Sequence, residues 1–375
     1  MCWWRTGCEH KPDGRLVTAT VVTSLPLCSA HGVRCTLSGV TMLSLFGALL
    51  NRPPVADKAV LARITYDPGS QRLQIPWPSG MTPGAASAPH GTGQIPYSDV
   101  LVFTYTAAEA RALADVLTPD YPSTSWVYYT TNYSAYAGQL TRRSPAASSK
   151  RLGSWVQVTI GSKRVTLFKS ELHPATDGPT LPLAQLVQQL IAEVNPQLVL
   201  TTGTAGAAGA GTQLGDINVA ANVRSDFRRL SPSKAQWACS GLTSGMSSYL
   251  AMMPSMSPAQ SRLPPSNNYQ PKVWYGDTVS TDFFAYDTSD DHFGLRAYDP
   301  DIRAVEMDDA AVALGVQRAA NRYLGFMSVR NASDPVMPDY SKSSSKTASS
   351  IYQKYGYWTT TNSALGTWAL VAGLS

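Results

Sequence analysis

The sequence predicts an α/β fold, because strands and helices alternate along most of the chain. Asp99–Thr106 is a continuous run of β-branched and aromatic residues, typical of a buried strand, and Ala107–Leu117 follows it as a helix. Pro182 opens a second helix, whose apolar residues recur at helical spacing as far as Val194, and Gln197–Thr202 is the next buried strand. This alternation indicates a sheet layered by helices.

The remaining elements are expected in the same alternating order. They are a hairpin over Trp155–Ile160 and Arg164–Lys169, strands over Asp216–Val223, Lys272–Ser280 and Phe326–Arg330, and helices over Ile302–Tyr323 and Asn362–Leu374. Residues 231–271 are rich in Ser, Met and Pro and are interpreted as an insertion. Residues 1–50 have no clear period, and residues 51–98 hold eight prolines and five glycines. We therefore expect an N-terminal appendage and linker over 1–98 and the α/β domain over 99–375.

Composition excludes several classes of protein. The chain has 375 residues, and its hydrophobic fraction of 43% excludes a disordered chain. Only 15% of residues are charged, against about 25% in an average soluble domain. The net charge of +5 has no run of Lys and Arg behind it, so a nucleic-acid partner is not predicted. No apolar segment approaches the length of a membrane span, so a membrane partner is not predicted either.

The N-terminal residues offer no metal site. Four of the five cysteines lie in the first 35 residues, but none forms the closely spaced pair that a zinc site needs. We expect no metal and no cofactor. Leu16–Leu27 and Val40–Leu50 faintly resemble signal peptides, although Thr and Ser interrupt both. The expected location is the cytoplasm, with export left open.

Polar residues that follow strands are the first candidates for a site, because open α/β sheets bind ligands at the carboxyl ends of strands. Thr201–Gly211 follows a buried strand and is interpreted as a glycine-rich loop. A dinucleotide fingerprint would open a helix, whereas another strand follows here, which excludes that motif. A tight structural turn is the alternative. Glu109 begins the helix after the first strand, either as a functional acid or as a carboxylate favoured by the helix dipole.

Two further segments concentrate polar groups. Val305–Ala310 sets acids inside an expected Ala-rich helix, where Glu306 and Asp309 share a face and Asp308 points elsewhere. Arg330–Asp334 leads from a strand into a loop, with an Asx-type turn as the alternative. A serine nucleophile is not supported, because no G-x-S-x-G elbow is present. The histidines at 10, 31, 90, 173 and 292 lack ligand spacing, and each is expected to be structural.

Five segments occur together in one order: the strand and turn leading to Glu109, TTGTAG with LGD downstream, VSTDFF, VEMDDA and VRNASD. From about Asp99 to Pro335 the chain therefore resembles the purine/uridine nucleoside phosphorylase superfamily, most of all the 5′-methylthioadenosine/S-adenosylhomocysteine nucleosidase type. The resemblance implies a three-layer α/β/α sandwich around a twisted mixed sheet. It also implies cleavage of the N-glycosidic bond of a purine nucleoside or thionucleoside by a homo-oligomer.

The resemblance also implies a role for individual residues. Asp334 would be the general acid that protonates the leaving purine, oriented by Ser333 and Arg330, and Glu109 would hold the attacking water. The implied substrate-binding set is Thr204 at the water or a phosphate, Gly206 beside it, Phe284 stacked on the base, Met307 under the sugar, Asp308 and Glu306 at the ribose, with Ser333 and Arg330.

Three departures from the family pattern bear on these roles. The family usually has Glu where this chain has Asp308, so either the ribose sits deeper or Asp309 or Glu306 substitutes. Residues 171–179 replace the usual glycine-rich turn. Neither Thr106-Ala-Ala nor Gly203-Thr-Ala contains the arginine that would bind phosphate, which favours hydrolysis. A phosphate-dependent phosphorylase and a non-catalytic nucleoside-binding protein are the alternatives.

The acids are unevenly distributed. Ten of the 25 fall between Asp277 and Asp309, and this stretch is expected to line the sugar and base site.

Overall fold

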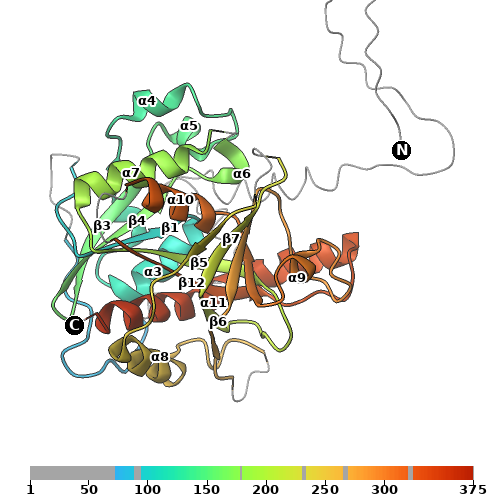
Figure 1. Cartoon of the computed structure of the whole chain (residues 1–375). Coiled ribbons are helices and arrows are strands. Elements are labelled where there is room, and N and C mark those ends of the chain that lie inside the picture. The colour runs from blue at the N-terminus through green and yellow to red at the C-terminus, as the bar shows by residue number, and fades with distance from the viewer. Residues whose placement is uncertain are drawn as a thin grey trace, which may run out of the picture. The chain divides into compact units, whose positions relative to one another are not determined.

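A mixed β-sheet with helices on both faces is the main feature of the computed structural model (Figure 1). The structure describes residues 72–87, 94–177, 180–229, 234–264, 269–319 and 324–374, which all belong to one compact unit, Ser38–Ser375. Within these residues the strands are β1 (Val100–Thr104), β2 (Val127–Tyr129), β3 (Gly153–Ile160), β4 (Lys163–Ser170), β5 (Leu198–Ala207), β6 (Ile217–Val219), β7 (Asn222–Asp226), β8 (Gln236–Ala238), β9 (Val273–Trp274), β10 (Asp277–Thr281), β11 (Ile302–Glu306) and β12 (Gly325–Asp334).

The helices differ widely in length. They are α3 (Ala107–Leu117), the 3₁₀ turn η1 (Ser123–Ser125), α4 (Tyr133–Ala137), α5 (Pro145–Ser149), α6 (Pro174–Asp177), α7 (Pro182–Val194), α8 (Ser244–Met256), α9 (Leu295–Tyr298), α10 (Asp309–Ala319) and α11 (Lys342–Ala372). None of the helices in the described stretches combines the length and the apolar character needed to cross a membrane.

The strand order places β5 at the centre. The main path of the sheet is β2-β3-β4-β1-β5-β11-β10-β7-β8, and β12 pairs with both β5 and β6. β1 and β12 run parallel to β5, whereas β11 runs antiparallel to it. β5 and β12 are each ten residues long, whereas β1 has only five. The carboxyl-terminal halves of β5 and β12 therefore extend past the end of β1. This extension is where the pocket described below forms.

Helices cover both faces of the sheet. Residues of α3, α8 and α11 share one hydrophobic cluster with Val100 and Val102 of β1. Residues of α7 and α10 share a second cluster with Leu101 and Phe103 of the same strand. Alternate residues of β1 therefore face opposite layers, as expected for a strand buried on both sides. The predicted α/β/α sandwich with a mixed sheet is confirmed.

Several elements have the predicted bounds, because their end signals are local. α3 begins at the N-cap Thr106, whose side chain accepts from the Glu109 N–H while the Glu109 carboxylate accepts from the Thr106 N–H. α7 begins with Pro182 in its first turn and ends at Asn195, which has a φ of 56°. The hairpin of β3 and β4 is likewise confirmed.

The helix expected over Ile302–Tyr323 is wrong in its first part. Residues 302–306 form β11, and α10 begins only at Asp309. β11 pairs with β10 on one side and with β5 on the other. Backbone pairing with these distant strands therefore decides the conformation of a segment whose local pattern resembles a helix.

The glycine-rich segment Thr201–Gly211 is mostly not a loop, because β5 continues through it to Ala207. Small residues are needed there since β11 and β12 flank the strand closely. A Cβ added at Gly206, for example, would lie 3.0 Å from Cγ1 of Val305.

Three further elements differ from the expectation. Asp216–Val223 is divided between β6 and β7, and Lys272–Ser280 between β9 and β10. The tail helix begins at Lys342, well before the expected Asn362, because Ser341 caps it and a polar half-helix precedes the apolar half.

Part of the expected N-terminal appendage lies against the sheet. The Gly84 N–H donates to the Thr159 carbonyl of β3 over 2.7 Å, and the Trp77 and Trp368 rings pack with their centroids 5.1 Å apart. The early cysteines and both signal-like stretches lie outside the described residues.

Candidate active site

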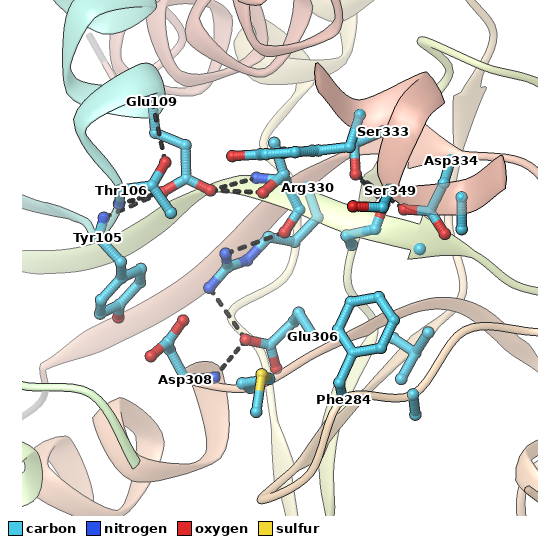
Figure 2. Close-up of a pocket in the computed structure, with 18 of the residues that line it drawn as sticks. Tyr105, Thr106, Glu109, Phe284, Glu306, Asp308, Arg330, Ser333, Asp334 and Ser349 are labelled. Atoms are coloured by element: carbon cyan, nitrogen blue, oxygen red, sulfur yellow. Dashed lines mark hydrogen bonds and ion pairs between the residues drawn. The ribbon is translucent and has the colours of Figure 1, made fainter. Parts of the chain in front are cut away.

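One pocket gathers all ten residues predicted as site residues. It is formed by the segments that follow β1, β4, β10 and β11, by the carboxyl-terminal halves of β5 and β12, and by one face of α11. The lining residues are Tyr105, Thr106, Glu109, His173, Thr204, Ala205, Gly206, Phe284, Ala285, Val305, Glu306, Met307, Asp308, Arg330, Ser333, Asp334, Ala348, Ser349 and Tyr352. Figure 2 shows Glu109 and Asp334 on opposite sides of this pocket, with Glu306 and Asp308 between them on another wall.

Glu109 is buried and bridges α3 to β5. Its Oε2 accepts from the Thr106 N–H over 2.9 Å and from the Tyr105 N–H over 3.1 Å. Its Oε1 accepts from the Thr204 N–H over 2.8 Å and from the Thr204 hydroxyl over 2.6 Å. Gly203 makes this approach feasible, because a Cβ there would lie 2.6 Å from Oε1. Glu109 is therefore both a helix-capping residue and part of the pocket wall.

Asp334 lies at the other side, at the end of β12. Burial raises the pKa of its carboxyl from the usual value near 4 to about 7. Ser333 Oγ lies 3.0 Å from Asp334 Oδ1 and 3.1 Å from the Ala205 carbonyl oxygen. A hydroxyl has one proton to donate, so Ser333 can donate to Ala205 and accept from a protonated Asp334, or donate to an ionised one. The Asp334 side chain can thus hold or release a proton near neutral pH.

Arg330 is buried among acids rather than beside Asp334. Its guanidinium makes two contacts with the Asp309 carboxylate, and Nη2 lies 3.2 Å from Glu306 Oε2. The resemblance implied that Arg330 orients Asp334. The structure corrects this: of Ser333 and Arg330, it is Ser333 that contacts Asp334. Arg330 instead contacts Asp309 and Glu306, in the segment where β11 ends and α10 begins.

Glu306 and Asp309 do not share a helix face, since Glu306 is the last residue of β11. Its Oε2 accepts from the backbone N–H groups of Asp308 and Asp309 and so caps α10, while Ser280 donates to Oε1. Burial, followed by the charge of Asp309, raises the pKa of Glu306 to about 8. This acid is therefore largely protonated at neutral pH.

The concentration of acids between Asp277 and Asp309 has a mainly structural cause. Of those ten, only Glu306 and Asp308 line the pocket. Asp277 and Asp299, for instance, pair with Arg224 at 2.8 and 3.1 Å. The expectation that this stretch as a whole lines the sugar and base site is wrong.

His173 is the main residue that sequence reasoning missed. It was expected to be structural, yet it lines the pocket, and its Nε2 lies 3.2 Å from Asp308 Oδ1. Its position just after β4, within the segment that replaces the family's glycine-rich turn, was the available signal. Tyr105, Thr106, Ser349 and Tyr352 also line the pocket without having been singled out. Among the described residues, no cluster of His, Cys, Asp and Glu is arranged to hold a metal ion.

A family model described as Phosphorylase superfamily matches residues 133–352, which is more than half of the chain. The chain therefore belongs to the phosphorylase superfamily. This confirms the superfamily that the ordered motifs indicated and, with it, the expectation of an enzyme. No curated protein sequence matches the chain.

Several solved structures resemble the chain at low sequence identity. The 5′-methylthioadenosine/S-adenosylhomocysteine nucleosidase of Neisseria meningitidis, in complex with methylthio-immucillin-A, is 17% identical with a TM-score of 0.46, over 73% of this chain and 98% of that one. The same nucleosidase of Helicobacter pylori, with butyl-thio-DADMe-Immucillin-A, is 13% identical with a TM-score of 0.48, over 73% and 98%. Futalosine hydrolase of H. pylori is 13% identical with a TM-score of 0.47, over 72% and 96%.

Proposed function

We propose that this protein hydrolyses the N-glycosidic bond of a purine nucleoside or thionucleoside. The observation that carries the proposal is the pairing, across one pocket, of a buried Asp334 carboxyl with a pKa near 7 and the Glu109–Thr204 hydrogen-bonded pair. Cleavage of this bond needs a proton donor for the base on one side of the sugar and a nucleophile on the other. The position of these two groups on opposite sides of one pocket supports this assignment of roles.

Asp334 acts as the general acid. A general acid works best when its pKa lies near the working pH, because it is then protonated often enough and still gives up its proton readily. The proton passes from Asp334 to the departing purine, and Ser333 then turns its hydroxyl to stabilise the carboxylate left behind. Phe284 lines the same side of the pocket and supplies an aromatic face for the base (Figure 2).

In this mechanism the ribose lies against Met307 and Asp308, which line the pocket just after β11. Positive charge develops on the sugar as the bond to the base breaks, and a nearby carboxylate stabilises that charge. Asp309 is neutralised by Arg330 and Glu306 is largely protonated, so Asp308 is the acid of the three that is left to contact the sugar hydroxyls.

Glu109 activates the water through Thr204. The five hydrogen bonds that Glu109 accepts already occupy both carboxylate oxygens. The Thr204 hydroxyl donates to Glu109 and keeps its own lone pairs for the pocket. The attacking water donates to Thr204 Oγ1 as the Thr204 proton moves toward Glu109, and the water oxygen forms the new bond to the sugar.

Water fits this end of the pocket better than phosphate. Arg330 is the only Arg or Lys among the lining residues that the structure describes, and its charge is already matched by Asp309. A phosphate dianion would instead meet the Glu109 carboxylate and find no arginine fork. Hydrolysis is therefore proposed ahead of phosphorolysis.

The test is base release from methylthioadenosine, adenosine and inosine, each with and without phosphate, followed by chromatography of the free base. Release that does not depend on phosphate is expected. Strict dependence on phosphate would make the protein a phosphorylase, and tight binding without release would make it a nucleoside-binding protein. Light scattering of the purified chain tests the homo-oligomer that the resemblance implies.

A further inference from the structure

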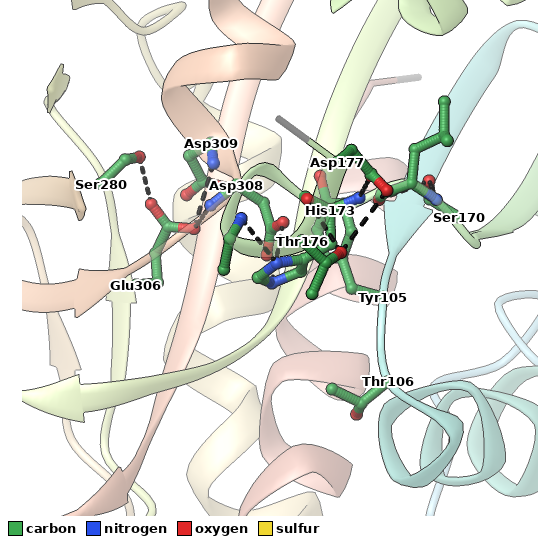
Figure 3. Close-up of polar contacts among 12 residues, drawn as sticks. Tyr105, Thr106, Ser170, His173, Thr176, Asp177, Ser280, Glu306, Asp308 and Asp309 are labelled. Carbon is green, nitrogen blue, oxygen red and sulfur yellow. Dashed lines mark hydrogen bonds and ion pairs between the residues drawn. The ribbon is translucent and has the colours of Figure 1, made fainter. Parts of the chain in front are cut away.

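His173 and Asp308 form a buried pair that joins two distant parts of the chain. His173 lies between β4 and α6, and Asp308 lies between β11 and α10. The imidazole Nε2 is 3.2 Å from Asp308 Oδ1, and the two side chains are only 3% and 6% exposed. Figure 3 shows His173 between Asp308 on one side and Asp177 on the other.

The imidazole is held in one orientation. Its Nδ1 accepts from the Ala175 N–H over 3.2 Å, so a neutral ring carries its proton on Nε2, the atom that faces Asp308. The His173 backbone N–H donates to the Asp177 carboxylate. The Tyr105 ring packs edge-on against the imidazole, with centroids 6.3 Å apart. In either protonation state, therefore, Nε2 carries a proton, and this is the ring atom that lies 3.2 Å from Asp308 Oδ1.

The two acids nearest to Asp308 in the sequence, Glu306 and Asp309, already have other partners. Asp309 is held by Arg330 and by the Ser328 hydroxyl, and Glu306 caps α10. Among the described residues, the one ion-pair partner of Asp308 is His173. An aspartate is also one methylene shorter than a glutamate, so its carboxylate reaches less far into a pocket.

We propose that His173 is a positioning residue that fixes the Asp308 carboxylate against the ribose hydroxyls and thereby makes the enzyme selective for ribonucleosides over 2′-deoxyribonucleosides. This inference rests on the proposed function. The imidazole lies at ion-pair distance from Oδ1 and fixes the carboxylate from that side, and Oδ2 accepts from the sugar. His173 occupies the space into which a longer acid would have to fit, so the short Asp308 and the imidazole act as one unit.

Three variants test the unit, with adenosine and 2′-deoxyadenosine as the substrates. His173→Ala is expected to raise KM for adenosine by about 10- to 100-fold, since the buried Asp308 carboxylate is left without its ion-pair partner. It should change KM for 2′-deoxyadenosine far less. His173→Gln keeps an N–H donor at the Nε2 position and should retain most of the selectivity. Asp308→Glu combined with His173→Ala should restore selectivity, because the longer acid fills the space that the imidazole leaves.

The matched control is His292→Ala. His292 stacks on Tyr340 outside the pocket lining and should leave both substrates unaffected. Equal losses on the two substrates in His173→Ala, or no recovery in the double variant, would show that His173 is merely structural. If His173→Ala does not fold, His173→Gln and the double variant decide the matter by the same ratio.

The proposed function can fail separately from this inference. If the wild-type protein binds nucleosides without cleaving them, the same ratio is measured as affinities by calorimetry. A preference for adenosine that disappears in His173→Ala would support the positioning role without catalysis. The absence of any preference in the wild type would refute it.

Discussion

Replacing Asp334 by Asn separates the stability cost of a buried carboxyl from its catalytic use. Burial raises the pKa of Asp334 to about 7 in the folded chain, whereas an Asp in an unfolded chain has a pKa of about 3.9. Between these values the folded chain holds the proton and the unfolded chain has released it. Stability therefore falls as pH rises from about 4 to about 7 and stays at its lower level above that range.

The size of this effect follows from the shift. One pKa unit corresponds to about 1.4 kcal/mol, so ionised Asp334 lowers the free energy of unfolding by at most about 4 kcal/mol at pH 8. Asn has nearly the same shape and cannot ionise. Asp334→Asn is therefore expected to match the wild type near pH 4 and to exceed its free energy of unfolding by about 1–4 kcal/mol near pH 8.

Urea unfolding across this pH range measures the difference directly. Asp177, whose pKa burial also raises to about 7, and Glu306 titrate in both proteins, so their contributions cancel in the comparison. A difference between the two proteins that does not change with pH would refute the claim that Asp334 titrates near neutrality in the folded chain.

The same variant should lose activity. Base release is expected to fall by about 10²- to 10⁴-fold, because the leaving purine no longer receives a proton from the enzyme. In the wild type, kcat should decline above about pH 7 as Asp334 ionises, and this decline should disappear from whatever activity the variant retains. An unchanged rate in Asp334→Asn would remove this residue from the mechanism.

Three further substitutions test the rest of the pocket. Glu109→Gln should lower kcat by about 10²- to 10³-fold, since the amide cannot take the proton that Thr204 relays. The control is Asp120→Asn, at an exposed ion pair, which should leave activity unchanged in the same assay. Arg330→Met should lower the free energy of unfolding by about 3–5 kcal/mol in urea titrations, because the Asp309 carboxylate is left buried without a counter-ion. Adding Asp309→Leu should recover part of this loss. Gly203→Ala should both destabilise the chain and reduce kcat, since Gly203 has a φ of 150° and its new Cβ would lie 2.6 Å from Glu109 Oε1; retention of full activity would contradict this geometry.

Local signals made part of the fold predictable. α3 and α7 have the predicted bounds because a capping box and a first-turn proline define their starts. β11 was mistaken for helix because Ile302–Glu306 gains its strand conformation from β10 and β5, which lie far away in sequence. The same holds for the end of β5, whose glycines suggest a loop until β11 and β12 are placed beside it.

The candidate site divides in the same way. Its ten predicted residues were found because the family motifs fix their order, and strand ends bring them to one pocket. The partners of those residues were not predictable. Arg330 sits four residues before Asp334, which would put both side chains on one face of a regular strand. The register of β12 shifts between Ala332 and Asp334, however, and Arg330 reaches Asp309 instead. His173 carries no motif at all, and only the folded sheet brings it to Asp308.

The arrangement of charge explains how the chain can bury several acids in and beside one pocket. Asp309 is balanced by Arg330, Glu306 is neutral below a pKa of about 8, and Asp308 is paired with His173. Each of these three acids is thus either protonated or paired with Arg330 or His173, which removes most of the free-energy cost of burying it. In the proposed reaction, a sugar that becomes positive would meet an Asp308 carboxylate that is already buried beside His173. The Arg330–Asp309 ion pair also leaves Arg330 without free charge for an incoming phosphate, so the pairing that stabilises these buried acids is consistent with the proposed use of water as the nucleophile.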